Sequence, residues 1–451
     1  MDGLFLGTET HLGGTVAPKM LPRAGYNSQA ALRSESPMIR RFALISLSLI
    51  LASGLASVTG AAAEKTQKKP RVIVLGVNGA EWDFLRPLLI RGELPNLQKV
   101  ISNGVYGKLQ TLSAPNCPKV YTTINTGVPP EENGVTGFVV GGITANTNML
   151  KSEPMWSILS KRGVSVGMAN VPATFPAMPV NGYMVTGMLT RGKGCEDGVL
   201  CAPKLSEVQG GDAVYPRSMV PELEAKVGDF YIDCSRMPNA EQLVGKEEKE
   251  INQWLAGVQN IREQQTKLFD YLLTNHPQDF TFLVQSCEDR VGHWLYPIQP
   301  HNVGYNPKIN AVRVDAFPNQ YRALDNVLGT ILKHVDDDTY LFIISDHGIK
   351  PLRQLGEAHH DASHGGAKST TPVIAKHDYP DGDDVPGAFI AMGPGIKKNV
   401  EISGFVGKVF DVAPTLLHLY GIPQPPQMKG RVLTEIFESS PKTQTAGVHQ
   451  H

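Results

Sequence analysis

The strongest constraint on the fold is a series of short apolar runs, rich in β-branched residues, with amphipathic helices between them. The first run is RVIVLGV at 71–77, and similar runs lie at 164–171, 280–286, 340–346 and 388–393. Runs of this length and composition are typical of strands buried on both faces of a parallel sheet. Strands alternating with helices predict an α/β fold, with a mostly parallel central sheet and helices on both faces.

Helical periodicity supports the predicted α/β fold and separates the predicted core from an inserted region. Apolar residues share one helix face at Ile251, Trp254, Leu255, Val258, Ile261, Leu268 and Leu272. A second such face lies at 324–335, and Pro95 stands where a helix start tolerates proline. The stretch 192–249 is polar and glycine-rich, and it predicts an inserted cap region. The predicted catalytic core is therefore 71–191 and 250–440, followed by a polar tail at 441–451.

The segment 38–63 has the three parts of a secretory signal peptide: two arginines, an apolar stretch and small residues in A-x-A register. We expect Met38 to be the true start and residues 1–37 to be a doubtful extension. The apolar stretch is short for a membrane span, although an uncleaved anchor is the alternative. The prediction is export to the periplasm or beyond, with no stable membrane span after cleavage.

Charge and cysteine content narrow the possible partners. The chain has 42 Lys and Arg against 43 Asp and Glu, so no basic surface for nucleic acid is evident, and 41% hydrophobic residues exclude disorder. Five cysteines leave at least one thiol unpaired in an exported protein. Cys195 and Cys201 are close enough for a local disulfide. Cys287 is interpreted as a small core residue, and Cys234 is unassigned.

Polar residues follow several of the predicted strands. In an open α/β sheet, ligands bind at the carboxyl ends of the strands. Carboxylate and imidazole groups there suit zinc, but a single Asp–His pair is more often a structural pair. Two pairs, each after a buried strand, keep the metal interpretation open. The candidate residues are Asn78, Asp289, His293, Asp346, His347 and His377.

Six stretches together resemble the type I phosphodiesterase and nucleotide pyrophosphatase branch of the alkaline phosphatase superfamily. The resemblance runs from about residue 71 to 436, and 170–190 looks like the predicted phosphohydrolase or phosphomutase group. The stretches are VIVLGVNGAEWDFLRPLLIRGELPNL (72–97), CPKVYTTINTGVPPEENGV (117–135), SCEDRVGH (286–293), SDHG (345–348), GPGI (393–396) and DVAPTLLHLYGIP (411–423).

The resemblance implies two divalent metal ions, zinc with manganese as the alternative, and a Ser or Thr nucleophile that is phosphorylated and then hydrolysed. By motif, Asp289, His293 and His377 would hold the first metal, while Asp346 and His347 would hold the second. The spacer after His377 is longer than in many relatives. The competing histidines of the preceding loop are His359, His360 and His364.

Two positions depart from the family pattern. Asn78 replaces an Asp, and Cys117 replaces the nucleophile. An amide is a weaker ligand than a carboxylate, but a thiolate restores the lost charge. Position 123 is Thr rather than the Arg of cysteine phosphatases, and Pro118 is one place early for the formylglycine pattern of sulfatases. Cys117 is therefore a nucleophile, a zinc ligand or an inert thiol. Lys119 could bind phosphate or face solvent.

These residues predict an exported, metal-dependent hydrolase of phosphoric esters, either a phosphodiesterase or a phosphomonoesterase, with a variant active site. The substrate would be a phosphorylated small molecule or lipid, and Cys117 or a metal-bound water would attack phosphorus. The alternative is a pseudoenzyme that binds a phosphorylated or sulfated ligand, or a partner protein, through the degenerate cleft.

Overall fold

The computed structural model divides the chain into two units, 1–67 and 68–451, and all the residues it describes belong to the second. The predicted extension 1–37, the signal peptide 38–63 and the tail 441–451 lie outside the described residues. Among the described residues, no helix is long and apolar enough to cross a membrane. The described ranges are 69–195, 201, 203–234, 247–301, 305–351, 375–376 and 384–438.

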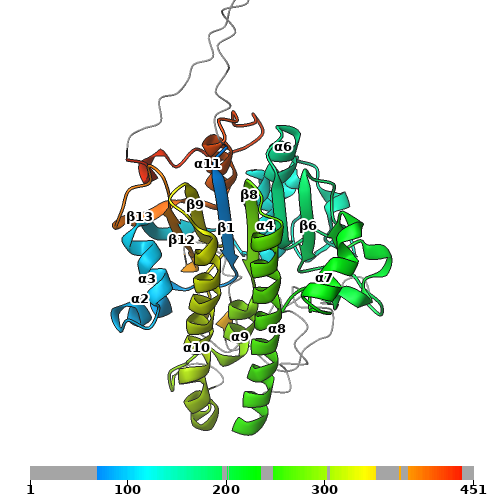
Figure 1. Ribbon diagram of the computed structural model, residues 1–451. Helices are drawn as coiled ribbons and strands as arrows, with labels where there is room; N and C mark the ends of the chain where they lie inside the picture. Colours follow the sequence, from blue (N-terminus) through cyan, green and yellow to red (C-terminus); the bar gives the residue numbers. More distant parts are fainter. Residues whose placement is uncertain are drawn as a thin grey trace, which may run out of the picture. The chain divides into compact units, whose positions relative to one another are not determined.

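A nine-stranded mixed sheet forms the centre of the described part (Figure 1). Strand β1 (Arg71–Val77) lies between β8 (Phe280–Gln285) and β9 (Thr339–Ser345) and is parallel to both. Beyond β8, strands β5 (Val166–Asn170) and β6 (Gly182–Gly187) continue the parallel part. This arrangement confirms the predicted α/β fold with a mostly parallel central sheet.

The remaining strands complete the two sides of the sheet. On the β9 side the order is β12 (Gly387–Met392), β2 (Gly104–Gln110) and β13 (Val400–Lys408), with β12 antiparallel to both of its neighbours. On the other side, β7 (Val214–Tyr215) pairs antiparallel with β6. Two small hairpins are separate from the sheet: β3 (Val139–Val140) with β4 (Ile143–Thr144), and β10 (Lys350–Pro351) with β11 (Ala375–Lys376).

Helices cover both faces of the sheet. One face carries α2 (Trp82–Ile90), α3 (Pro95–Ser102), α8 (Glu248–Asn275), α9 (Cys287–Leu295) and α10 (Pro307–Ile331), and α8 and α10 lie side by side in front of the sheet in Figure 1. The other face carries α4 (Cys117–Thr126), α5 (Pro130–Asn133), α6 (Met155–Lys161) and α11 (Val412–Leu419). Short 3₁₀ helices lie at Thr147–Met149, Leu205–Glu207, Gln209–Gly211, Arg217–Met219, Leu332–His334, Val409–Asp411 and Thr434–Ile436.

Strand β1 shows why the apolar runs of the sequence indicate strands of the central sheet. Val72 and Val74 pack into the core beneath α4 and α11, while Ile73, Leu75 and Val77 pack into the core beneath α3 and α10. None of these five side chains is more than 1% exposed. Because successive side chains of a strand point to opposite faces, a strand covered on both faces must be apolar at nearly every position.

The predicted insertion, 192–249, packs onto the molecule through apolar side chains. Its described residues include β7 and helix α7 (Val220–Lys226). Leu205, Leu223, Phe230 and Ile232 are buried in the same core cluster as the inner face of α8. The insertion is thus joined to the α8 face of the sheet through a buried apolar core.

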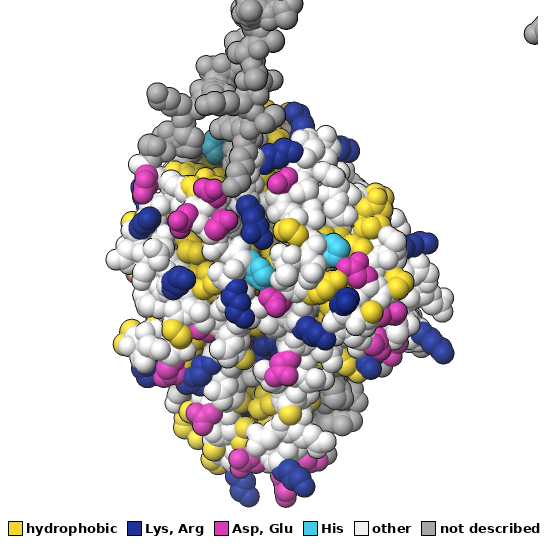
Figure 2. Space-filling model, viewed as in Figure 1, with side chains coloured by type: hydrophobic (Ala, Val, Ile, Leu, Met, Phe, Trp, Pro, Cys, Tyr) yellow, Lys and Arg dark blue, Asp and Glu magenta, His cyan; other side chains and the backbone are white. Residues whose placement is uncertain are grey.

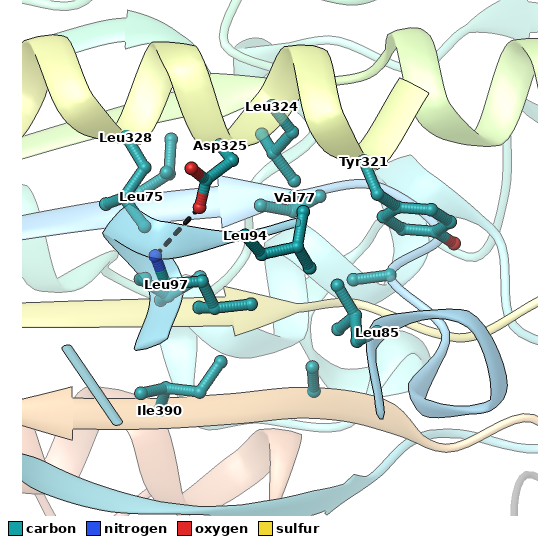
Figure 3. Close-up of a pocket in the computed structure, with 13 residues that line it drawn as sticks. Leu75, Val77, Leu85, Leu94, Leu97, Tyr321, Leu324, Asp325, Leu328 and Ile390 are labelled. Carbon is teal, nitrogen blue, oxygen red and sulfur yellow. Dashed lines mark hydrogen bonds between the residues drawn. The ribbon is translucent and has the colours of Figure 1, made fainter. Parts of the chain in front are cut away.

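A small cavity lies between β1, α3 and α10 (Figure 3). Its volume is about 30 Å³, enough for one water molecule, but its walls are mainly leucine and isoleucine side chains. The one charged group at its wall, Asp325, is already engaged: Oδ1 accepts from the Leu97 amide at 2.8 Å and Oδ2 from the Asn96 amide at 3.2 Å. The cavity is therefore a packing defect, and Asp325 fixes the start of α3.

Replacing Asp325 with Ala should lower the free energy of unfolding by about 1–3 kcal/mol, because the first amides of α3 lose their acceptor. Urea titration of the purified protein measures this change. Asp315→Ala, at an exposed position of the same helix, should stay within about 0.5 kcal/mol of wild type. Equal stability of the two variants would show that Asp325 does not hold α3.

Candidate metal centre

Four of the predicted site residues meet at the carboxyl ends of β1 and β9. The Asn78 Nδ2 donates a hydrogen bond to Cys117 Sγ over 2.8 Å. His347 Nε2 lies 3.2 Å from Asp346 Oδ2 and 4.0 Å from Cys117 Sγ. One potential ligand atom from each of Cys117, Asp346 and His347 lies within 4.8 Å of the other two, and all three residues are buried.

Local sequence places Cys117 at the first position of α4. Asn116 caps the helix, since its side chain accepts from the Lys119 amide at 3.2 Å. Gly127 ends the helix in the left-handed region with φ 63°. Cys117 therefore lies at the positive end of the helix dipole, which favours the thiolate.

A glycine after β1 allows the second group of predicted ligands to approach. Gly79 has φ +77°, and a Cβ there would lie 2.9 Å from the Cβ of Asp289. Its amide donates to Asp346 Oδ1 at 3.4 Å. The Tyr321 hydroxyl of α10 donates to the Gly79 carbonyl at 3.1 Å and accepts from the Glu81 amide at 3.2 Å. The loop after β1 is thus fixed between α9 and α10.

Asp289 and His293 lie one turn apart on α9, each 3% exposed, with Oδ2 and Nε2 3.4 Å apart. The negative charge of Asp289 contributes to raising the pKa of Asp346, so the two groups of predicted ligands share one electrostatic environment. His377 lies outside the described residues, so its role stays a prediction. The competing histidines His359, His360 and His364 also lie outside them.

The orientation of the His347 ring suits a metal ligand. Its Nδ1 lies 3.0 Å from the Gly348 carbonyl, which can only accept a hydrogen bond. Nδ1 must therefore carry the proton if this bond forms, and the lone pair is left on Nε2. That nitrogen is the one directed at Asp346 and Cys117. A backbone carbonyl that fixes the tautomer in this way is typical of metal-binding histidines.

Buried negative charge dominates the site. Burial raises the pKa of the Cys117 thiol well above its usual value, and Asp346 and Asp289 raise it further. Burial likewise raises the pKa of Asp346, and Asp289 adds to the effect. The Asn78 hydrogen bond opposes the shift at Cys117. These groups resist ionisation together unless a positive charge joins them.

The residues fit a divalent metal ion. Thiolate, imidazole and carboxylate are zinc ligands, and zinc bonds of about 2.0–2.3 Å place ligand atoms about 3–4 Å apart, near the spacings seen here. The Oδ1 of Asn78 is buried and has no hydrogen-bond partner among the described residues. Because amide orientation follows hydrogen bonding, this oxygen is the atom available to a cation. Asn78, Cys117, Asp346 and His347 together can therefore hold one metal.

The structure settles the pairing of the five cysteines, all of which it describes. Disulfides join Cys195 to Cys201 and Cys234 to Cys287. Cys287 is buried, as expected of a small core residue, and it is bonded to Cys234. Cys117 is the one free cysteine. The odd thiol of the sequence is thus the residue in the candidate metal centre.

Lys119 lies beside the site but has local partners. Its Nζ donates to the carbonyls of Ser113 at 2.7 Å and Ala114 at 2.9 Å. These bonds fix the loop that leads into α4 and therefore the position of Cys117. A role in binding substrate stays a prediction.

Sequence reasoning missed a buried ion pair next to the site. Arg262 of α8 and Glu288 of α9 lie 2.9 Å apart, and their side chains are 2% and 0% exposed. Arg262 also donates to Gln320 of α10 at 2.9 Å. The sequence did contain one indication of this pair. Arg262 follows Ile261 and lies on the apolar face of its helix, where a charged side chain needs a buried partner. The pair binds α9 to α8 directly beside Asp289.

Comparisons with known proteins identify the family of the chain. The family model for type I phosphodiesterase / nucleotide pyrophosphatase matches residues 72–385. An extracellular sulfatase Sulf-1 homologue of Caenorhabditis elegans is 34% identical over 99 residues, which are 22% of this chain and 11% of that protein. The chain thus spans about a tenth of the length of this curated relative.

Two solved structures resemble the chain at low sequence identity. A Bacteroides thetaiotaomicron protein described as a sulfatase has a TM-score of 0.51 at 13% identity, over 83% of this chain and 76% of that one. Human ectonucleotide pyrophosphatase / phosphodiesterase 5 has a TM-score of 0.48 at 14% identity, over 82% of this chain and 100% of that one. The bacterial structure supports the fold and no more.

Thiol titration tests the pairing of the cysteines. In denaturant without reductant, a chromogenic disulfide reagent should detect one thiol per chain, because the other four cysteines are paired. Cys117→Ser should show none. Three reactive thiols in wild type would mean that one of the two disulfides is absent.

Proposed function

The chain belongs to the type I phosphodiesterase / nucleotide pyrophosphatase family, and from this premise we propose that it is an exported, metal-dependent hydrolase of phosphoric esters. The observation that carries the proposal is the position of Cys117. It begins α4, lies with Asp346 and His347 in one buried cluster, and shares the electrostatic environment of Asp289. A nucleophilic group and two sets of metal-ligating residues therefore converge at the carboxyl edge of the sheet.

Two divalent cations, zinc or manganese, would polarise the phosphoryl oxygens and stabilise the leaving alkoxide. Asp289 and His293, with His377, form one ligand set. The other set is Asn78, Cys117, Asp346 and His347.

The Cys117 thiolate is the proposed attacking group. Its sulfur would form a bond to phosphorus as the bond from phosphorus to the leaving alkoxide breaks. Water would then cleave the phosphorus–sulfur bond and restore the thiolate. Asn78 supports this role because its amide donates to the sulfur at 2.8 Å, and the N-terminus of α4 adds positive potential there. If water attacks phosphorus directly, Cys117 acts as a ligand only.

Phosphoric esters are favoured over sulfuric esters by the sequence around Cys117. Sulfatases of this superfamily need a Cys-x-Pro-x-Arg pattern, and here Pro118 follows Cys117 directly and Tyr121 stands at the position of the Arg. The substrate would be a phosphorylated small molecule or lipid. On the face seen in Figure 2, basic and acidic side chains are interspersed, which does not favour a nucleic-acid substrate.

Export is proposed from the signal-like segment 38–63 and from the cysteines. Two disulfides among five cysteines are typical of a protein that folds in an oxidising compartment. The curated relative is named as an extracellular protein, which supports the same location.

One observation favours a second candidate, a catalytically silent relative that binds its ligand without turnover. Cys117 is only 1% exposed, and its hydrogen bond comes from the other substituted position, Asn78. The two changed residues thus satisfy each other, as they would in a site that retains metal but not catalysis.

Hydrolysis assays separate these functions. Wild type, supplied with zinc or manganese, should hydrolyse p-nitrophenyl phosphate or its bis-ester, and Cys117→Ala should lower kcat by at least about a hundredfold. Ser113→Ala, at an exposed position before α4, is the matched control and should keep wild-type turnover.

The double reversion, Asn78→Asp with Cys117→Thr, decides the remaining case. If wild type is silent with both esters and the reversion alone turns over, the chain is the silent relative and the hydrolase proposal fails. If Cys117→Ala keeps full activity, the thiol is neither a nucleophile nor an important ligand. Metal content is measured in parallel, so loss of metal is distinguished from loss of the attacking group.

A further inference from the structure

The first turn of α9 joins the candidate metal centre to two other parts of the molecule. Its first three residues are Cys287, Glu288 and Asp289. Cys287 is bonded to Cys234 of the insertion, and Glu288 is paired with Arg262 of α8. Asp289 is the predicted metal ligand. Two consecutive residues before the ligand therefore anchor the turn that carries it.

A second contact lies beside the disulfide. The Ser286 hydroxyl donates to Asp233 Oδ1, and Asp233 is only 2% exposed. Ser286 immediately precedes α9, yet its side chain does not cap the helix. Two adjacent residues of the insertion thus hold two adjacent residues at the start of α9.

The insertion is itself hydrogen-bonded to α8, so its contacts with Ser286 and Cys287 can fix the position of α9. The Tyr231 amide donates to Gln264 Oε1 of α8 at 3.1 Å. Gln265 of α8 donates to the Ile232 carbonyl at 3.3 Å, and the Ile232 side chain is fully buried. Tyr231 and Ile232 of the insertion are therefore fixed on α8 immediately before Asp233 and Cys234.

We propose that the Cys234–Cys287 disulfide, with the Asp233–Ser286 contact, positions α9 so that Asp289 and His293 can bind metal. The inference rests on the proposed function, because it assumes that these residues are metal ligands. Forming the bond removes two electrons and two protons from the thiols, which a protein or small-molecule disulfide of the oxidising compartment accepts. The α9 metal site then reaches its full affinity only in the exported, oxidised protein.

The other disulfide provides an internal comparison. Cys195 and Cys201 are six residues apart and only partly buried, so their bond closes a local loop. The cluster of Cys117, Asp346 and His347 takes no residue from α9. The proposal therefore predicts that loss of Cys234–Cys287 affects one metal site, whereas loss of Cys195–Cys201 affects neither.

The expected effect is a loss of affinity rather than loss of the fold. Arg262 and Glu288 still bind α9 to α8 when the disulfide is absent, and the apolar side of α9 still packs in the core through Val291 and Leu295. Removing a group that orients a metal ligand typically weakens metal binding about 10–100-fold. The loosened turn should therefore weaken the α9 site by about that factor.

The test titrates zinc against a chromophoric chelator in the full exported chain, comparing wild type with Cys234→Ser/Cys287→Ser. The variant should bind zinc at the α9 site about 10–100-fold more weakly and at the Cys117 site within about threefold of wild type. Cys195→Ser/Cys201→Ser, the matched control, should keep both affinities. The two sites are distinguished with His293→Ala and Cys117→Ser, each of which removes a ligand from one of them.

Ser286→Ala provides a second test in case Cys234→Ser/Cys287→Ser does not fold, because it keeps the disulfide. It should weaken the same site a few-fold and leave the other unchanged. Wild-type affinity at both sites in the Cys234/Cys287 variant would overturn the inference while leaving the proposed function intact. Equal weakening of both sites would also overturn it, because the role would then be general stability. Wild type that binds neither zinc nor manganese would overturn the inference and the proposed function together.

Discussion

The candidate site depends on one electrostatic constraint, the concentration of negative charge in a buried space at the carboxyl edge of the sheet. Burial alone opposes ionisation of Cys117 and Asp346, and the charge of Asp289 opposes it further. A protein can relieve such repulsion by protonating the groups or by binding a cation. The lone pair of His347 and the unsatisfied oxygen of Asn78 add two further donor atoms for a cation, and with thiolate and carboxylate they make a set of ligands that suits zinc.

The sheet creates this concentration through its register. Val77, the last residue of β1, pairs with Ser345 of β9 on one side and with Gln285 of β8 on the other. The residues that follow, Asn78, Asp346 and Ser286, therefore leave the sheet at the same level. Apolar packing on both faces of β1 fixes that register, because a shift by one residue would reverse every side chain. The chemistry at the edge is thus set by packing in the interior.

The sequence predicted the strands that are buried on both faces, because such strands are apolar at nearly every position. β1, β5, β8, β9 and β12 all appeared as apolar runs because both of their faces are buried. β13 did not, since most of its side chains are at least partly exposed and its pairing is irregular. Asn78, Cys117, Asp346 and His347 were found because each stands in a recognisable motif. The Cys234–Cys287 bond was not, because it joins residues 53 apart and no local pattern indicates the partner.

The proposed function depends most directly on whether Cys117 is in the coordination shell of a metal. X-ray absorption at the zinc edge of the zinc-loaded protein tests this directly, because Cys117 is the one free cysteine and any zinc–thiolate signal can be traced to it. The account predicts a sulfur scatterer at about 2.3 Å from zinc. That signal should disappear in Cys117→Ser, with nitrogen and oxygen neighbours remaining. A shell of nitrogen and oxygen alone in wild type would contradict the account.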